Sequence, residues 1–114
     1  MIEDITIAKM ADTLSIASDL TRLSILVYLL GDDFASGESH RCHVEDTLPQ
    51  VERSVSEIVA HTGASQSLVS HQLKILKSAH LVSCRREGRM MFYSLSDGHV
   101  RELVEVVLEH VQEE

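Results

Sequence analysis

Residues 64–95, ASQSLVSHQLKILKSAHLVSCRREGRMMFYSL, contain the pattern that decides the fold. Ser65 can cap a helix that begins directly after it, and Gly63 can supply the left-handed turn that ends a helix before it. Apolar residues at helical spacing predict that earlier helix from Val51 to His61. The chain therefore predicts a helix, a tight turn and a second helix over residues 54–79.

The second helix of this unit has two distinct faces. At about 100° per residue, one arc collects the apolar residues Leu68, Val69, Leu73, Ile75 and Leu76. The other face offers small hydrogen-bonding groups, an imidazole and cations, which suit a helix lying in the major groove of DNA. The alternative is an ordinary solvated face. The candidate DNA contacts on this helix are Gln66, Ser67, Ser70, His71, Lys74 and Lys77.

Residues 81–95 predict two strands around the turn Glu87-Gly88. Three arginines surround the tip of this hairpin: Arg85, Arg86 and Arg89. A basic hairpin directly after a candidate recognition helix is the layout of a winged helix-turn-helix, in which the wing contacts the DNA backbone or minor groove. We therefore expect a mainly α fold with a β-hairpin wing.

The N-terminal part, residues 1–30, predicts two helices. Residues 5–17 and 19–30 show helical periodicity, and Ser18 or Asp19 can cap the second helix. Residues 31–50 hold two glycines and the only proline, so we expect a long loop insertion there.

The C-terminal residues 97–114 predict one amphipathic helix, which completes a single domain over residues 1–114. The net charge is −8, but residues 64–93 carry five basic side chains and one acidic. This local positive region, more than the total charge, decides whether a polyanion can bind.

Other classes of protein are disfavoured by the composition. No apolar run approaches the roughly 20 residues that span a bilayer, and the N-terminus has no secretion signal, so we expect a cytoplasmic protein without a membrane partner. The two cysteines, Cys42 and Cys84, make no disulfide framework. No nucleophile–base pair is visible, and we expect no enzymatic activity.

The motif Ser-x-Ser-x-x-Ser-His-x-Leu, followed by Arg-x-Gly-Arg and Tyr-x-Leu, matches residues 65–95 and resembles the DNA-binding core of the ArsR/SmtB family of bacterial metal-sensing repressors. The resemblance extends more loosely over residues 8–30 and 54–114. It implies a homodimer, formed through the first and last helices, that binds double-stranded operator DNA when metal-free and releases it when metal binds.

The same resemblance implies a metal site. A family site with two thiols is absent, because Ser54 and Ser56 occupy the corresponding positions. A second family site, on the last helix, matches without a gap and implies Zn(II), or else Co(II) or Cd(II), as the effector. Its implied ligands are Asp97 and His99 from one subunit with His110 and Glu113 from the other.

The spacing of the two histidines supports a shared site. His99 and His110 lie on the same face of the helix but roughly 16 Å apart along it, so one helix cannot bring both to one ion. Two antiparallel copies would place the start of one helix beside the end of the other. The simpler readings are that Asp97 is a helix cap and that the other groups are solvated.

Four further alternatives stay open. His80 is a candidate relay between the metal site and the recognition helix. The residues His40, Cys42 and His43 form a candidate auxiliary metal site in the loop. A thiol-switched repressor would use Cys42 and Cys84. A metal-buffering or protein-docking dimer would have lost its DNA function.

Overall fold

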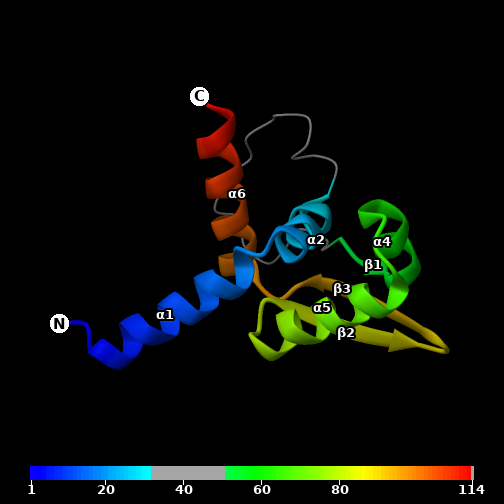
Figure 1. Cartoon of the computed structure of the whole chain (residues 1–114), viewed down its shortest axis with the longest axis horizontal. Coiled ribbons are helices and arrows are strands. Elements are labelled where there is room, and N and C mark those ends of the chain that lie inside the picture. The colour runs from blue at the N-terminus through cyan, green and yellow to red at the C-terminus, as the bar shows by residue number, and fades with distance from the viewer. Residues whose placement is uncertain (32–50, 114) are drawn as a thin grey trace.

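Five helices and three strands occupy the residues that the computed structural model describes, 1–31 and 51–113 (Figure 1). In chain order they are α1 (Asp4–Ala17), α2 (Leu20–Leu30), β1 (Arg53–Ser54), α4 (Val55–Thr62), α5 (Gln66–Ser78), β2 (Val82–Glu87), β3 (Met90–Leu95) and α6 (Gly98–Gln112). The expected order of helices and hairpin is confirmed.

Helix α2 lies at the centre of the hydrophobic core. It contacts every other helix in this part of the chain as well as β3. Its side chains Ile25, Leu26 and Leu29 are almost completely buried, and burial of a large aliphatic side chain contributes about 1.5–3 kcal/mol to folding. The remaining core residues come from α2 itself, the other elements and the turn before β2: Leu30, Ile58, Val69, Leu73, Leu76, Leu81, Val82, Leu95, Val100 and Val104.

Local capping signals in the sequence fix where the helices begin and end. Asp19 accepts a hydrogen bond from the backbone N–H of Arg22, so the second of the two expected caps is the one used for α2. Ser65 caps α5 as expected. Gly63 ends α4 with φ 72°, a left-handed conformation that favours glycine.

The expected helix start at Val51 is wrong. Residues 53–54 instead form the short strand β1, which pairs antiparallel with β3. Ser54 then begins α4 through a capping box, in which its hydroxyl accepts from the N–H of Glu57 and the Glu57 carboxylate accepts from the N–H of Ser54. Arg53 lies over the ring of Tyr28 at 4.4 Å from its centroid, which holds this strand against α2.

The wing is part of a three-stranded antiparallel sheet with the order β1-β3-β2. Strands β2 and β3 pair along their full length, from Val82 opposite Leu95 to Glu87 opposite Met90. Gly88 makes the turn with φ 62°. The expected hairpin is therefore confirmed, with β1 as an additional strand beside β3.

Helix α1 extends away from the rest of the molecule and has no buried residue (Figure 1). Among residues 1–31 and 51–113, no single helix is long and apolar enough to cross a membrane; α1 and α2 would pass that test only as a pair, and they are bent by 84°. The expected loop at 31–50, with its candidate ligands His40, Cys42 and His43, lies outside the described residues apart from Gly31.

Candidate functional sites

Helix α5 presents a polar outer face. Its buried side chains are Val69, Gln72, Leu73 and Leu76. The expectation that Leu68 belongs to the buried arc is wrong, because this side chain is 41 % exposed. The buried arc is centred on Leu76 and Val69, and Leu68 lies at its edge. All six candidate DNA contacts on this helix are exposed: Gln66, Ser67, Ser70, His71, Lys74 and Lys77.

A polar side chain lies within the buried side of α5, where the sequence analysis expected only apolar residues. Gln72 is 9 % exposed, and its Oε1 accepts a hydrogen bond of 2.7 Å from Nη1 of Arg22. The Nε of Arg22 donates to the backbone carbonyl of Ile16 at 2.7 Å. Arg22 therefore links the C-terminal end of α1 to the centre of α5. A glutamine among apolar neighbours on a helix face was the available signal, because a buried amide requires a partner.

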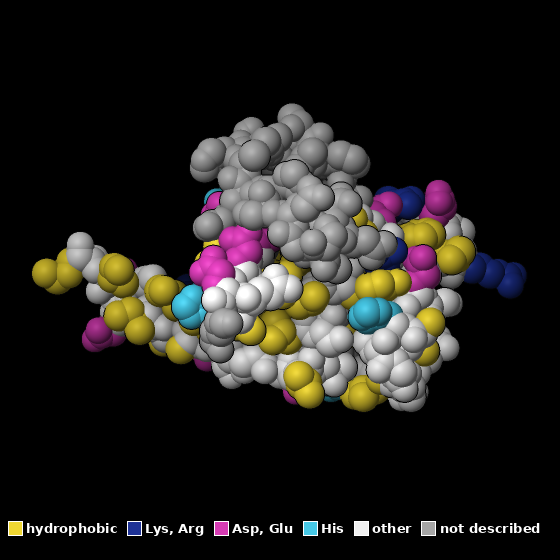
Figure 2. Space-filling view, turned by 90° about the horizontal axis from the view of Figure 1, so that it is seen from above, with side chains coloured by type: hydrophobic (Ala, Val, Ile, Leu, Met, Phe, Trp, Pro, Cys, Tyr) yellow, Lys and Arg dark blue, Asp and Glu magenta, His cyan; other side chains and the backbone are white. Residues whose placement is uncertain are grey.

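The wing carries the three predicted arginines in different settings. Lys and Arg side chains project at the end of the molecule that holds the hairpin tip (Figure 2). Arg86 and Arg89 are exposed, and Arg86 donates from Nε to the carbonyl of Gly88 at 3.3 Å. Arg85 is also exposed, but its guanidinium forms ion pairs with the neighbouring carboxylates of Glu52 and Glu87.

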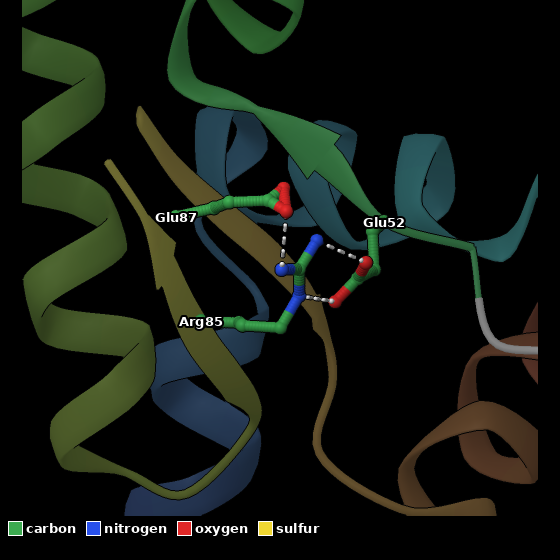
Figure 3. A network of polar contacts seen from close by, with 3 residues as sticks. All are labelled: Glu52, Arg85 and Glu87. Atoms are coloured by element: carbon green, nitrogen blue, oxygen red, sulfur yellow. Dashed lines mark hydrogen bonds and ion pairs between the residues drawn. The ribbon is translucent and has the colours of Figure 1, made fainter. Parts of the chain in front are cut away.

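Arg85 makes two parallel hydrogen bonds with Glu52, each 3.0 Å long (Figure 3). Its Nη1 lies 3.5 Å from a carboxylate oxygen of Glu87, and its guanidinium carbon lies 4.9 Å from the ring centroid of Phe92. The hydrogen bonds from Arg85 lower the pKa of Glu52, and those to Glu52 raise the pKa of Arg85. Sequence analysis missed Glu52, which precedes its partner by 33 residues.

The N-terminal end of α6 holds the first predicted pair of metal ligands close together. Asp97 is the helix cap and accepts a hydrogen bond of 3.0 Å from the N–H of Val100. The same carboxylate oxygen lies 3.9 Å from Nδ1 of His99, whose side chain is 97 % exposed. The capping reading of Asp97 is thus confirmed, and it leaves the carboxylate beside the imidazole.

The second predicted pair, His110 and Glu113, is exposed at the opposite end of α6. The chain therefore does not bring the two pairs together within one protomer. In residues 1–31 and 51–113, no group of three or more His, Cys, Asp and Glu side chains is placed to hold a metal ion. A site made of these four ligands requires a second subunit.

Between the two predicted ligand pairs, α6 exposes apolar side chains. Val100 and Val104 are buried against the core, whereas Leu103 and Val106 are 37 % and 40 % exposed. Together with His99, His110 and Glu113, these two residues form what we call the outer stripe of α6, which points away from the core. Val107 and Val111 add further exposed apolar surface beside it.

Helix α1 has a comparable apolar surface. An open hollow of about 470 Å³ lies where α1 and α6 approach each other, lined by Thr6, Lys9, Met10, Thr13, Leu14 and Leu103. Hydrophobic side chains gather along the α1 arm in Figure 2. The exposed apolar residues of this arm are Met1, Ile2, Ile5, Ile7, Met10 and Leu14.

The candidate relay lies just before the first wing strand, and the candidate thiol lies within that strand. His80, just after α5, has φ 62°, and its backbone carbonyl accepts a hydrogen bond of 2.6 Å from the hydroxyl of Ser96. Cys84 is half-buried on β2 opposite Tyr93. Burial, followed by the charge of the neighbouring Cys84, raises the pKa of Tyr93. Cys42 lies outside the described residues.

Comparison with known proteins identifies this arrangement. A family model described as "Bacterial regulatory protein, arsR family" matches residues 47–83. The chain is 42 % identical over 79 residues to a transcriptional repressor SmtB homolog of Synechocystis, covering 69 % of this chain and 60 % of that protein. It is 36 % identical over 62 residues to a cadmium resistance transcriptional regulatory protein CadC homolog of Staphylococcus aureus, covering 54 % and 51 %. The chain thus spans about half to three fifths of the length of these curated relatives.

A solved structure supports the fold. The homodimeric winged helix-turn-helix DNA-binding domain of a possible ArsR-family transcriptional regulator from Mycobacterium bovis is 26 % identical, with a TM-score of 0.71, and the match covers 99 % of this chain and 94 % of that one. The expected winged helix-turn-helix fold is confirmed. The relatives are named as regulators, which agrees with the expectation that the chain is not an enzyme.

Proposed function

The chain belongs to the ArsR family of bacterial regulatory proteins, and from this premise we propose that it is a metal-responsive transcriptional repressor. It binds operator DNA as a homodimer and leaves the DNA when Zn(II) binds between the subunits. The observation that carries this proposal is the outer stripe of α6, where an exposed apolar surface separates two pairs of metal-ligating side chains.

DNA binding is assigned to α5 and the wing. The exposed face of α5 carries hydroxyls, an imidazole and two lysines, which can contact base edges and phosphates in the major groove. The exposed Arg86 and Arg89 add positive charge at the tip of the wing. Because the total charge is −8, the rest of the chain is acidic and does not attract DNA, so the attraction is confined to the side that carries these basic residues.

Dimerisation is assigned to α1 and α6. Ten of the fourteen large exposed hydrophobic residues of the described chain lie on α1, just before it, or on α6, and an exposed apolar patch of this kind is typical of a protein interface. The solved M. bovis relative is homodimeric. Antiparallel packing of two outer stripes would cover Leu103 and Val106 and bring opposite ends of the two helices together.

The four ligands fit a divalent zinc ion in their chemistry. Asp97 and His99 from one subunit, with His110 and Glu113 from the partner, provide two neutral imidazoles and two carboxylates. Such a set balances the charge of Zn(II) in four-coordinate geometry and also suits Co(II) or Cd(II). Bound zinc would crosslink the two α6 helices. The exposed His99 beside Asp97 needs no rearrangement of the core to become a ligand.

Two hydrogen-bonded links connect the dimer helices to the recognition helix. Ser96, the residue before Asp97, donates to the carbonyl of His80 at the end of α5. Arg22 joins the end of α1 to Gln72 in the middle of α5. A change in the angle between subunits would therefore move α5 relative to its half-site, where spacing must match about one turn of DNA. In this scheme His80 acts through its backbone carbonyl.

The test is a zinc titration of the protein bound to a fluorescent palindromic duplex. The His99→Ala and His110→Ala variants should bind the duplex like the wild type but stay bound when zinc is added. Gln112→Ala, on the same turn of α6, is the matched control and should release DNA normally. Zinc-driven release of the two histidine variants would show that the sensor lies elsewhere, and a monomeric wild type would rule out the shared site.

A further inference from the structure

We infer that Glu52 holds Arg85 away from DNA, so that the wing contacts the DNA backbone through Arg86 and Arg89 and not through Arg85. This inference rests on the proposed DNA binding and adds a residue that determines specificity to it. Glu52 lies just before β1, outside both the recognition helix and the wing hairpin.

The contacts of Arg85 occupy the edge that a phosphate would use. Arginine binds a carboxylate or a phosphate through two parallel N–H groups in the same planar geometry. In this protein the Nε and Nη2 groups of Arg85 donate to the two oxygens of Glu52 at 3.0 Å each (Figure 3). The Glu52 carboxylate therefore stands in the position of a backbone phosphate.

The remaining surface of the Arg85 guanidinium is also engaged. Nη1 lies 3.5 Å from Glu87, and one face of the group covers the ring of Phe92. The three charged residues carry a net charge of −1, which would repel a phosphate that approached this corner. A DNA phosphate that bound Arg85 would have to displace the Glu52 carboxylate. It would gain hydrogen bonds of the same type as those it replaced, and the carboxylates of Glu52 and Glu87 would both remain close to the DNA backbone.

The two faces of the hairpin differ in the charged side chains that they carry. Successive side chains of a strand point to opposite faces, so Arg86 projects away from Arg85 and Glu87. The register agrees, because Arg86 lies opposite Met91, whereas Arg85 lies opposite Phe92 on the face that Glu52 reaches. One face thus carries a neutralised arginine, and the other face and the tip carry exposed cations.

The consequence is a lower affinity for DNA of any sequence. Phosphate contacts supply nearly all of non-specific binding, and each contact steepens the salt dependence of binding by about 0.9. Removing Arg85 from the set of phosphate contacts weakens binding to all DNA alike and leaves the base contacts of α5 unchanged. The share of binding that depends on sequence is therefore larger.

The experiment compares the wild type, Glu52→Gln and the double variant Glu52→Gln/Arg85→Gln. Each protein binds a family operator-like palindrome and an unrelated duplex, and the logarithm of affinity is measured against the logarithm of salt concentration. Glu52→Gln should free Arg85 and steepen the slope by about 0.9 on both duplexes. The ratio of the affinity at about 50 mM salt to the affinity at about 200 mM salt should then be about threefold larger in this variant than in the wild type. The double variant should return to the wild-type slope, because it lacks both charges.

A wild-type slope that becomes shallower by about 0.9 in the double variant would overturn the inference, since Arg85 would then contact phosphate despite Glu52. An unchanged slope in Glu52→Gln would overturn it as well. Arg85→Gln alone provides a second route that leaves Glu52 intact: the inference predicts an unchanged slope, and a shallower slope contradicts it. Failure of the wild type and of Glu52→Gln to bind either duplex at low salt would instead refute the proposed function.

Discussion

Helices α5 and α6 are both amphipathic, yet they leave different kinds of surface open. Helix α5 buries its apolar side in the core of its own chain and exposes polar groups. Helix α6 buries Val100 and Val104 but exposes Leu103, Val106 and two further valines on its other sides. Apart from the exposed Leu68, the hydrophobic residues of α5 are therefore covered within one protomer, whereas α6 leaves four hydrophobic side chains exposed.

The two helices therefore carry two kinds of surface. The polar face of α5 is built by one chain alone, whereas the proposed site on α6 needs a second chain. The polar face of α5 and the wing tip are formed by a single protomer, with Arg22 and Glu52 as internal partners of Gln72 and Arg85. The two proposed ligand pairs stand at opposite ends of α6, so one protomer alone does not bring them together. Substitutions on the two helices should therefore disturb different properties, and four predictions test this.

The largest effect is expected on the buried side of α5. Leu73 is fully buried, and Leu73→Ala removes apolar contacts and leaves a cavity, so the free energy of unfolding should fall by about 2–5 kcal/mol. Urea denaturation measures this loss. Leu68→Ala, on the same helix but 41 % exposed, is the matched control and should change stability by less than about 0.5 kcal/mol. Equal losses for the two variants would contradict the division of α5 into a buried and an open side.

On α6, the outer stripe should control association and leave protomer stability almost unchanged. Val106→Lys places a charge in the centre of the proposed interface and should raise the dimer dissociation constant by at least about 30-fold, or roughly 2 kcal/mol. Sedimentation equilibrium measures this constant. Gln112→Lys adds the same side chain to an exposed position on another side of α6 and should leave the dimer intact. A dimer that tolerates Val106→Lys would show that the outer stripe is not the interface.

The predictable parts of the fold are those specified by neighbouring residues. Asp19, Ser65 and Gly63 act within a few residues of their own positions; the sequence predicted Ser65 and Gly63 directly and Asp19 as one of two alternatives. Strand β1 was missed because its two residues pair with β3, some forty positions later. A two-residue strand has no periodicity of its own, so only its partner reveals it.

The same limit applies to the functional surface. The polar residues of α5 were predicted from helical spacing alone, and their exposure agrees. Glu52 was missed because a pair separated by 33 residues leaves no local pattern. Leu68 was misplaced because periodicity gives the direction of a side chain but not how far the neighbouring elements cover that side of the helix. The four predicted metal ligands at the ends of α6 come from the family resemblance, and their proposed assembly needs a second chain.

Asp97 should show two separable roles at the start of α6. Because it caps the helix through the N–H of Val100, Asp97→Ala should lower the free energy of unfolding by about 1 kcal/mol in the absence of metal. Asp97→Asn keeps the cap and should be nearly neutral without metal. Both variants should lose zinc-driven release from DNA. Chemical denaturation with a chelator measures the first effect, and a zinc response retained by Asp97→Asn would remove Asp97 from the ligand set.

The smallest effect concerns the internal partner of the wing and its dependence on pH. Hydrogen bonds from Arg85 hold the pKa of Glu52 below its ordinary value of 4.5, so between those two values the unfolded chain binds more protons than the folded one. The stabilisation by this pair is therefore complete above the ordinary pKa and is lost as the pH falls through the lowered pKa of folded Glu52. The urea midpoint of Glu52→Gln should lie slightly below that of the wild type at pH 7 and merge with it in acid. Glu3→Gln, at the exposed start of α1 without a capping hydrogen bond, should match the wild type at both pH values. If the difference in urea midpoint between Glu52→Gln and the wild type grows on acidification, ionised Glu52 does not stabilise the wing through Arg85. The wing would then lack the internal partner that distinguishes it from the exposed face of α6.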